Sequence, residues 1–393
     1  MPERTLKRTA RIQATEVFRD YTLIFVVLFL LALGLVMLYS TSSYEAALQF
    51  GDSAHYLKKQ LFSTVIGLLV MLLVSVLPYR LWGRLATPAF ILAVVLILAI
   101  IPFGVESGGA KRWLYFFGVS FQPAEAAKLA TIVVAAAMIE KLGSLVKTLK
   151  GMFLVFLPPA ILSFMLYKIT RNLSSAMIVM AIVACMVFVA VPDYKRFVVL
   201  AILVVAAGAF WIFLTLRNAQ AAEDTLNFRG NRILAWLDPQ AYADDTAFQT
   251  LQALYAIGSG GLFGKGLGQS MQKLGYIPEA QNDMIFSIIC EELGLFGAIC
   301  IILLFIIMIW RFIFIANNAV DLFGAMLVVG VTGHIAVQVI LNIAVVTNTI
   351  PNTGVTLPFI SYGGTSVLFL LFEVGMVLSV ARGIRLKAID NSQ

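Results

Sequence analysis

Apolar runs rich in Leu, Ile, Val, Ala and Phe recur along the whole chain and strongly limit its fold. A helix of about 20 apolar residues crosses a hydrocarbon core of roughly 30 Å. An outer-membrane barrel would show alternating segments of about ten residues, which this sequence lacks. The runs predict an all-α polytopic membrane protein with about ten transmembrane helices. The predicted spans are 21–40, 61–78, 85–104, 123–141, 152–168, 174–191, 196–216, 284–310, 321–346 and 364–383.

The low content of charged residues excludes a water-soluble fold. Only 12% of the residues are charged, against about 25% in soluble domains. The net charge of +7 comes from Lys and Arg dispersed over short loops and termini, so it does not indicate nucleic-acid binding. Cys185, Cys290 and Cys300 lie in apolar runs without metal-ligand spacing, and the two histidines form no zinc motif. Neither metal nor redox chemistry is implied.

The distribution of cations predicts the topology, because Lys and Arg concentrate in cytoplasmic segments. One set of alternate segments is rich in cations: Arg4, Lys7, Arg8, Arg11, Arg19, Arg80, Arg84, Lys141, Lys147, Lys150, Lys195, Arg196, Arg311, Arg382, Arg385 and Lys387. Both termini are therefore predicted in the cytoplasm, as a basic N-terminus (1–20) and a tail (384–393) around one membrane domain (21–383). The first apolar run is too long for a signal peptide and lacks a cleavage pattern, so we expect an uncleaved span.

One connection is much longer than the others. Residues 217–283, between the seventh and eighth predicted spans, form a large loop predicted to be extracellular. Loops of this length are usually functional or disordered. Apolar residues such as Phe228, Trp236 and Tyr255 indicate that this one packs against the membrane face.

The end of this loop, 258–283, is rich in glycine and finishes at Asp283. A phosphate-binding Walker loop is excluded, because Ser259 and Gly266 stand where glycine and Ser or Thr are required. Asp283 has two compatible interpretations. It could cap the following helix, or it could act as a poised base at the membrane rim.

Several polar residues lie at membrane depth, where they usually mark function or bond helices together. Glu125 and Lys128 share one helix face and are interpreted as functional. Glu291 and Glu292 lie two turns into the eighth span. The stripe of His334, Gln338 and Asn342 is interpreted as helix–helix hydrogen bonding.

Cations on the predicted outer side favour a phosphate or pyrophosphate ligand, since charge-assisted hydrogen bonds to phosphate are strong. They are Lys111, Arg112, Arg229, Arg232 and Lys265. Arg229 and Arg232 are spaced to close on one anion, although cations at a membrane rim also extend to the interface without a ligand.

Blocks of sequence, found in family order, resemble the SEDS proteins (shape, elongation, division and sporulation), a family of polytopic peptidoglycan glycosyltransferases. The blocks are GAKRW (109–113), QPAEAAK (122–128), RGNRILAWLDP (229–239), FQTLQALYAIGSGGLFGKGLGQS (248–270), YIPEAQNDMIFSIICEELGLFG (276–297) and NTGVTLPFISYGGTS (352–366). The PEAQND and SIICEELG elements are more similar to the division branch (FtsW-like) than to the elongation branch (RodA-like).

The resemblance implies ten spanning helices in a bacterial plasma membrane and polymerisation of lipid II on the outer face. It implies that Asp283, aligned with the family's essential aspartate, is catalytic. The candidate substrate-binding residues are Lys111, Arg112, Glu125, Lys128, Arg229, Arg232, Lys265, Glu279, Ser361 and Tyr362. One departure is TRNLSSA (170–176), where relatives carry a QPDLG-like element. Asn172 thus replaces an acid, and no role is carried onto it.

In the implied reaction, the 4-hydroxyl of an acceptor disaccharide attacks C1 of a lipid-linked donor and polyprenyl pyrophosphate leaves. An α-linked donor and a β-1,4 product require inversion, hence one displacement with one general base, Asp283. Nearby cations would stabilise the departing pyrophosphate. No cofactor is certain; a divalent cation could share this task, although the sequence contains no dedicated site.

The resemblance also implies partners and a location. Partners would be a class B penicillin-binding protein transpeptidase and other membrane proteins of the division machinery, at the septum. Two other functions stay open. A lipid II flippase would need a cavity opening to both leaflets, often built from inverted repeats, and no repeat is visible. A non-catalytic division scaffold would account for the basic ends but not for the outer-face charge.

Overall fold

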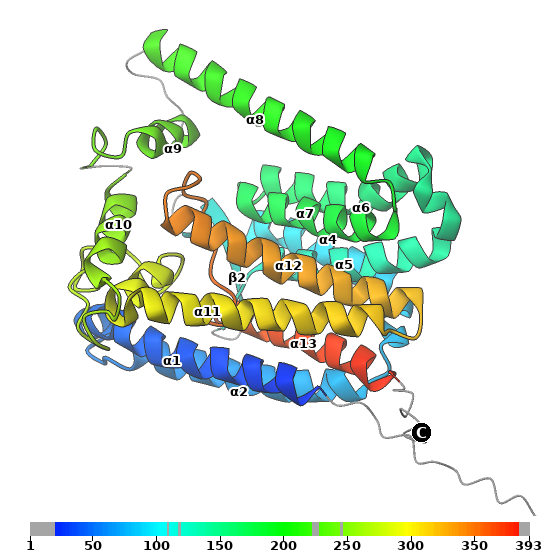
Figure 1. Cartoon of the computed structure of the whole chain (residues 1–393), viewed down its shortest axis with the longest axis horizontal. Helices are drawn as coiled ribbons and strands as arrows, with labels where there is room; N and C mark the ends of the chain where they lie inside the picture. Colours follow the sequence, from blue (N-terminus) through cyan, green and yellow to red (C-terminus); the bar gives the residue numbers. More distant parts are fainter. Residues whose placement is uncertain (1–19, 108–109, 117–118, 222–227, 244–246, 385–393) are drawn as a thin grey trace, which may run out of the picture.

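The computed structural model describes residues 20–384 except 108–109, 117–118, 222–227 and 244–246. The predicted cytoplasmic ends, 1–20 and 384–393, lie outside the described residues apart from Asp20 and Ile384. Most of the described chain forms long helices that run roughly alongside one another (Figure 1).

Ten helices in the described chain reach 18 residues or more. They are α1 (Tyr21–Phe50), α2 (His55–Val76), α4 (Ala86–Phe103), α5 (Pro123–Leu142), α6 (Leu149–Lys168), α7 (Leu173–Ala190), α8 (Tyr194–Ala221), α11 (Ile285–Asn317), α12 (Leu322–Val346) and α13 (Thr365–Arg382). The shorter elements are α3 (Arg80–Arg84), β1 (Val105–Ser107), β2 (Ala110–Phe116), β3 (Val119–Phe121), η1 (Gly143–Lys147), α9 (Phe228–Leu237) and α10 (Phe248–Gly260).

The predicted fold class is confirmed. Within the described residues, 9 helices are long and apolar enough to cross a membrane, and each overlaps a predicted span. The remaining predicted span, 196–216, falls in α8, which is outside these nine. With 28 residues, α8 is long enough to cross as well. It lies at the edge of the bundle in Figure 1, and its first turns contact the rest through Arg196 and Phe197.

Two C-terminal helices form the centre of the bundle. In α13, 78% of the most apolar window is buried inside the protein, and in α12 61%, against 22% in the peripheral α4. α13 packs on α2, while α12 packs on α5, α7 and α11. Because lipid can cover apolar side chains as well as protein can, the outer helices carry many exposed Leu, Ile and Phe residues.

At the start of several helices, a side chain caps the helix by accepting a hydrogen bond from a backbone amide of the first turn. The carboxylate of Asp20 accepts a hydrogen bond from the amide of Leu23 at the start of α1, and Asp321 accepts one from Gly324 at the start of α12. Asn172 caps α7 in the same way, accepting from Ser175 at 3.0 Å. Asn172 therefore has a structural role as a helix cap, for which Asn is as suitable as Asp.

A small antiparallel sheet, absent from the all-α prediction, connects α4 to α5. Its strand order is β1-β2-β3, with Leu114 opposite Phe121. The strand β2 carries Lys111 and Arg112 of the GAKRW block. A short sheet is possible at the end of the bundle because its backbone N–H and C=O groups can form hydrogen bonds with water or with one another there.

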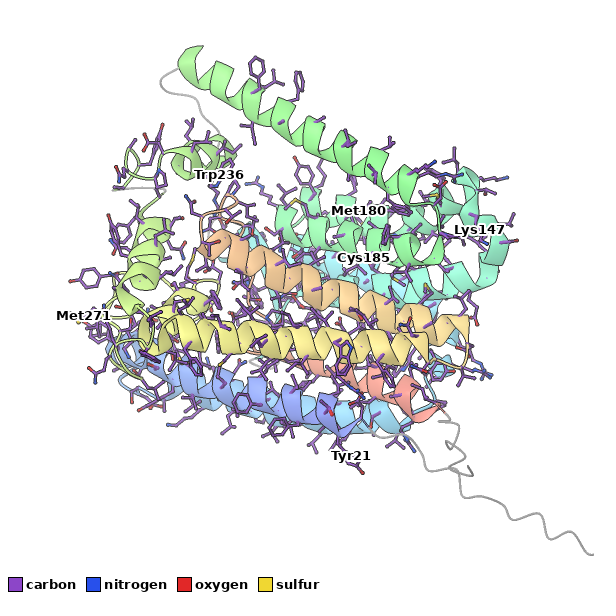
Figure 2. The ribbon with its side chains drawn as sticks, viewed as in Figure 1. Tyr21, Lys147, Met180, Cys185, Trp236 and Met271 are labelled. Carbon is purple, nitrogen blue, oxygen red and sulfur yellow. The ribbon has the colours of Figure 1, made fainter. Side chains whose placement is uncertain are left out.

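The two ends of the bundle differ in character. Figure 2 labels Trp236 and Met271 at one end and Lys147 at the other. The segment 217–283, predicted as a large extracellular loop, contains the end of α8 together with α9 and α10. The indole nitrogen of Trp236 donates to the carbonyl of Asn348 at 3.0 Å and so fixes α9 at the end of α12. The side of the membrane that this end faces stays a prediction.

Candidate active site

Asp283 lies immediately before α11, but it does not cap that helix. The N-cap position is Met284, and no side chain makes a capping hydrogen bond there. The neighbouring Asn282 donates instead to the carboxylate of Glu279 at 2.8 Å. The capping interpretation of Asp283 is therefore wrong, and its half-buried carboxylate is left for another purpose.

Two segments surround the carboxylate of Asp283. The side-chain amide of Gln249, on α10, lies 3.5 Å from its Oδ1 atom. Gln249 accepts in turn from Asn352 at 3.1 Å. The backbone of Gly354 passes so close that a Cβ atom there would lie 3.8 Å from Oδ2 of Asp283. Gly354 has a φ of +66°, which favours glycine.

The pKa of Asp283 is raised to about 6, chiefly by burial and also by repulsion from Glu279. A hydrogen bond from its own backbone, the charge of Arg232 and the amide of Gln249 act in the opposite direction. At neutral pH the group is mostly ionised, yet it is a stronger base than an ordinary aspartate. A carboxylate with these properties can accept a proton from a hydroxyl group.

Two arginines contribute positive charge to the site: Arg232 acts on Asp283, and Arg112 is close enough to act on Arg232. Arg232, on α9, donates to the carbonyl of Asn352 at 3.0 Å. Arg112, on β2, lies 3.4 Å from the carbonyl of Thr170 and is half-buried. Burial lowers the pKa of Arg232, and repulsion from Arg112 lowers it further, whereas Asp283 raises it. Two guanidinium groups close enough to repel each other favour an anion between them.

Ser361 and Tyr362 stabilise the segment 352–364 that covers Asp283. Ser361 is buried, and its hydroxyl accepts from the amide of Leu357 at 2.8 Å. The amide of Tyr362 donates to the carbonyl of Gln281 at 2.9 Å. Its ring contacts Tyr56 edge-on, with centroids 5.1 Å apart. The structure thus gives both residues positioning contacts, while their predicted contact with substrate stays a prediction.

Glu125 and Lys128 form a buried ion pair of 2.8 Å on α5. The ammonium group of Lys128 lies 3.4 Å from Gln338 on α12, and Gln338 donates to the carbonyl of Thr356 at 3.0 Å. Through Gln338, this network connects α5 and α12 to the segment 352–364. His334 makes a separate contact of 2.8 Å with Glu373 on α13. The polar stripe on α12 therefore bonds elements together, as predicted.

The remaining predicted cations are placed differently. Lys265 makes an ion pair of 2.7 Å with Glu291, so its ammonium group is engaged away from Asp283. Lys111 is exposed at the end of the sheet. The side chain of Arg229 lies outside the described part of the chain. The binding roles of these three residues stay predictions.

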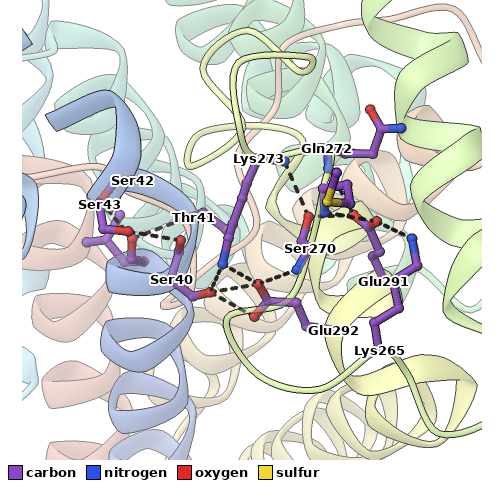
Figure 3. Close-up of polar contacts among 12 residues, drawn as sticks. Ser40, Thr41, Ser42, Ser43, Lys265, Ser270, Gln272, Lys273, Glu291 and Glu292 are labelled. Atoms are coloured by element: carbon purple, nitrogen blue, oxygen red, sulfur yellow. Dashed lines mark hydrogen bonds and ion pairs between the residues drawn. The ribbon is translucent and has the colours of Figure 1, made fainter. Parts of the chain in front are cut away.

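A second polar cluster, which the sequence did not reveal as a unit, surrounds Glu291 and Glu292 (Figure 3). Both carboxylates are fully buried. Glu292 pairs with Lys273 at 2.8 Å and accepts from the hydroxyl of Ser40 at 2.7 Å. Glu291 accepts from Ser270 and pairs with Lys265. The sequence does contain one signal for this cluster: two adjacent acids within an apolar span predict that cations lie close to them.

This cluster surrounds a break in α11. Gly294 has a φ of +67° and a ψ of −168°, which are not helical backbone angles. The carbonyl oxygens of Glu291 and Glu292 accept from the amides of Lys265 and Gly266 at 2.9 and 3.0 Å. The amide of Leu295 donates to the carbonyl of Gly261 at 2.9 Å. The segment 261–266 therefore replaces the hydrogen bonds that the helix loses.

Among the described residues, no group of three or more His, Cys, Asp or Glu side chains is arranged to hold a metal ion. The site consists of one perturbed carboxylate, flanking arginines and side-chain amides.

Comparison with known proteins decides the family. The family model of cell cycle proteins of the FtsW, RodA and SpoVE type matches residues 21–385. The chain belongs to this family. It is 36% identical over 369 residues to a probable peptidoglycan glycosyltransferase FtsW of Trichlorobacter lovleyi, covering 93% of this chain and 94% of the relative. It is 37% identical to the stage V sporulation protein E of Bacillus subtilis, covering 92% and 97% of the two chains.

The fold of this FtsW/RodA/SpoVE family member also matches a solved structure. That structure is described as "Structural coordination of polymerization and crosslinking by a peptidoglycan synthase complex". The TM-score is 0.74 at 26% identity, and the match covers 93% of this chain and 98% of the other. The resemblance predicted from sequence blocks is confirmed by both comparisons.

Proposed function

We propose that this chain is a peptidoglycan glycosyltransferase that polymerises lipid II on the outer face of the plasma membrane. The observation that carries the proposal is the carboxylate of Asp283. It caps no helix, has a pKa of about 6 and lies beside Arg232. Relatives that carry the glycosyltransferase name support the reaction class.

In the proposed reaction Asp283 is the general base. It accepts the proton of the acceptor's 4-hydroxyl while that oxygen forms a bond to C1 of the donor sugar. The bond from C1 to the pyrophosphate oxygen breaks on the opposite face, which gives inversion. A positioned base typically contributes about 10²–10⁴-fold to such a step.

Arg112 and Arg232 would stabilise the departing pyrophosphate. Charge develops on the leaving group in the transition state, and preorganised donors there are often the largest contribution to catalysis. The carbonyl contacts of both arginines hold their guanidinium groups in place before substrate binds. Lys111 and Arg229 belong to the same blocks and are proposed to extend this site.

The reaction requires Asp283 to face outward. The basic residues Arg80, Lys141, Lys147 and Arg311 belong to segments at the other end of the helices, which favours a cytoplasmic location for that end. In a cysteine-free background, a membrane-impermeant maleimide should label Leu274→Cys but not Lys150→Cys on intact spheroplasts. The reverse pattern would exclude an outer-face reaction.

The proposed partner is a class B penicillin-binding protein transpeptidase at the division septum, with other membrane proteins of the division machinery. The synthase complex among the structural matches supports a partner that crosslinks the new strand. The relatives named FtsW and stage V sporulation protein E support a role in division or sporulation.

The test is a polymerisation assay with labelled lipid II and the cognate transpeptidase. Asp283→Asn and Asp283→Ala should make no glycan strands, whereas Asp52→Asn should be as active as the wild type. Asp52 is a matched control because its side chain is 41% exposed and its partners, Lys58 and the amide of Ala54, lie outside the proposed site. Full activity of a folded Asp283→Ala protein would remove the base assignment. Lipid II transfer between leaflets without polymer would favour a flippase.

A further inference from the structure

A cavity of about 770 Å³ opens at the end of the bundle opposite Asp283. It is bounded by α3, the start of α4, the end of α5, α6 and the start of α12. Its volume is in the range of small-molecule sites, roughly 300–1,000 Å³. The reaction proposed above makes no use of this cavity.

One acid of the cavity is fully engaged. The carboxylate of Asp321 accepts from Arg80 at 2.9 Å, from the hydroxyl of Tyr79 at 3.0 Å and from the amide of Gly324 at 2.8 Å. Arg80 and Asp321 therefore neutralise each other and fix the rim of the cavity between α3 and α12.

Two other cations of the rim have no such partner. Arg84, in the last turn of α3, and Lys141, near the end of α5, are exposed and line the cavity. Within the described residues neither makes an ion pair or a side-chain hydrogen bond. Glu140 is the remaining acid, so the cations of the lining exceed its acids by one. This excess matches the single negative charge of a phosphodiester.

The floor of the same cavity is apolar. It is formed by Phe90, Met138, Pro158 and Phe323, from four different helices. Next to Phe90 and Pro158, the side chains of Ile91 and Leu157 are exposed on the outer surface, where lipid tails contact the protein. A ligand of this cavity therefore meets cations at the rim and apolar side chains at the floor, and exposed apolar residues are the sequence neighbours of that floor.

We propose that this cavity binds an anionic phospholipid from the leaflet opposite the active site. The phosphodiester would lie between Arg84 and Lys141, and the acyl chains would follow α4 and α6 into the bilayer. Basic pockets between transmembrane helices recognise anionic headgroups in this way. A zwitterionic lipid would bring its own ammonium group to a rim that already has an excess of cations.

The test measures lipid binding to the full chain in a neutral detergent, by native mass spectrometry and thermal unfolding. Phosphatidylglycerol should bind and raise the unfolding temperature of the wild type, while phosphatidylcholine and soluble glycerophosphoglycerol should not. The double variant Arg84→Gln/Lys141→Gln should lose at least about tenfold in affinity, since it removes both charge-assisted contacts to the phosphodiester. The control Lys147→Gln/Lys150→Gln, with the same change of charge outside the cavity, should bind as the wild type does.

Four results would overturn the proposal. Equal binding of phosphatidylcholine would show that the headgroup charge is not recognised. Full stabilisation by glycerophosphoglycerol would indicate a free-phosphate site rather than a lipid site. Unchanged affinity of Arg84→Gln/Lys141→Gln, or an equal loss in the control, would remove the assigned residues. The comparisons among ligands use only the wild type, so they hold even if the double variant folds poorly.

Discussion

The side-chain amide of Asn342 donates to the main-chain carbonyl of Asp283 at 2.7 Å and to that of Val355 at 2.7 Å. Both donors of one buried amide are thus used to hold two segments. One segment carries the proposed base, and the other passes over its carboxylate through Gly354. The central helix α12 therefore sets the position of the active site without touching the reacting groups.

Replacing Asn342 by Ala should lower kcat and leave the KM for lipid II nearly unchanged. The change removes both hydrogen bonds, and a small displacement of a catalytic group can reduce the rate about 10²-fold. Asn318→Ala is the matched control, because its amide donates to the carbonyl of Phe314 at the other end of the bundle. An Asn342→Ala protein with normal kcat and normal unfolding temperature would show that α12 does not position Asp283.

Activity should depend on the ionisation of Asp283. Its pKa is raised to about 6, and the base acts only when it is ionised. kcat/KM should therefore be maximal well above that pH and fall about tenfold per pH unit below it. Removing the repulsion from Glu279 lowers the pKa, so Glu279→Gln should move the midpoint to lower pH.

The measurement for this prediction is the pH–rate profile of kcat/KM for wild type, Glu279→Gln and the control Glu106→Gln. Glu106 is an exposed acid on β1 and should leave the midpoint unchanged. A midpoint that rises in Glu279→Gln, or a profile that is flat across this range, would contradict the assignment.

Apolar length predicted the spans well because it is a local property of the sequence. The prediction 321–346 agrees with α12 (Leu322–Val346), and 123–141 agrees with α5 (Pro123–Leu142). The error at α1 has a clear cause. The predicted span ended at residue 40, but the helix continues to Phe50 through the more polar turn around Glu45. Hydropathy detects where a helix leaves the lipid, not where its hydrogen bonds end.

The contacts of the site could not be predicted in the same way. The position of Asp283 before an apolar run makes it a candidate, yet its neighbours Gln249 and Gly354 come from remote segments. The partner of Lys265 lies 26 residues away in sequence, and that of Lys273 lies 19 residues away. Ion pairs between a loop and a helix depend on how the chain returns to the bundle. No local pattern specifies that return.

The ion pair between Lys273 and Glu292 should be important for stability because it is buried. Their side chains are 8% and 0% exposed, so Lys273→Met leaves a carboxylate without its cation. Removing one partner of a buried pair costs roughly 3–5 kcal/mol. Lys265→Met should cost less, because that side chain is 35% exposed. Lys58→Met, which breaks an exposed pair with Asp52, should cost about 0–1 kcal/mol.

Thermal unfolding in detergent gives this order directly. The double variant Lys273→Met/Glu292→Gln should recover much of the stability lost in Lys273→Met, since it removes the unpaired charge. Equal losses in all three single variants would show that burial does not control these pairs.

The break in α11 should not tolerate a side chain at Gly294. Its φ of +67° is left-handed, which costs other residues about 1–2 kcal/mol. An added Cβ would also lie 2.3 Å from the amide nitrogen of Gly264, so the inserted segment 261–266 would have to move. Gly294→Ala should therefore lower the unfolding temperature and reduce polymerisation, because α11 begins at the active site.

Gly208→Ala is the control for this variant. Gly208 lies in α8, where an added Cβ meets nothing within 4 Å. Since Ala favours helix over Gly by roughly 1 kcal/mol, this variant should be as stable as the wild type or more so. Wild-type stability of Gly294→Ala would show that α11 can form regular helical hydrogen bonds across residues 291–295. The segment 261–266 would then be dispensable for the shape of α11.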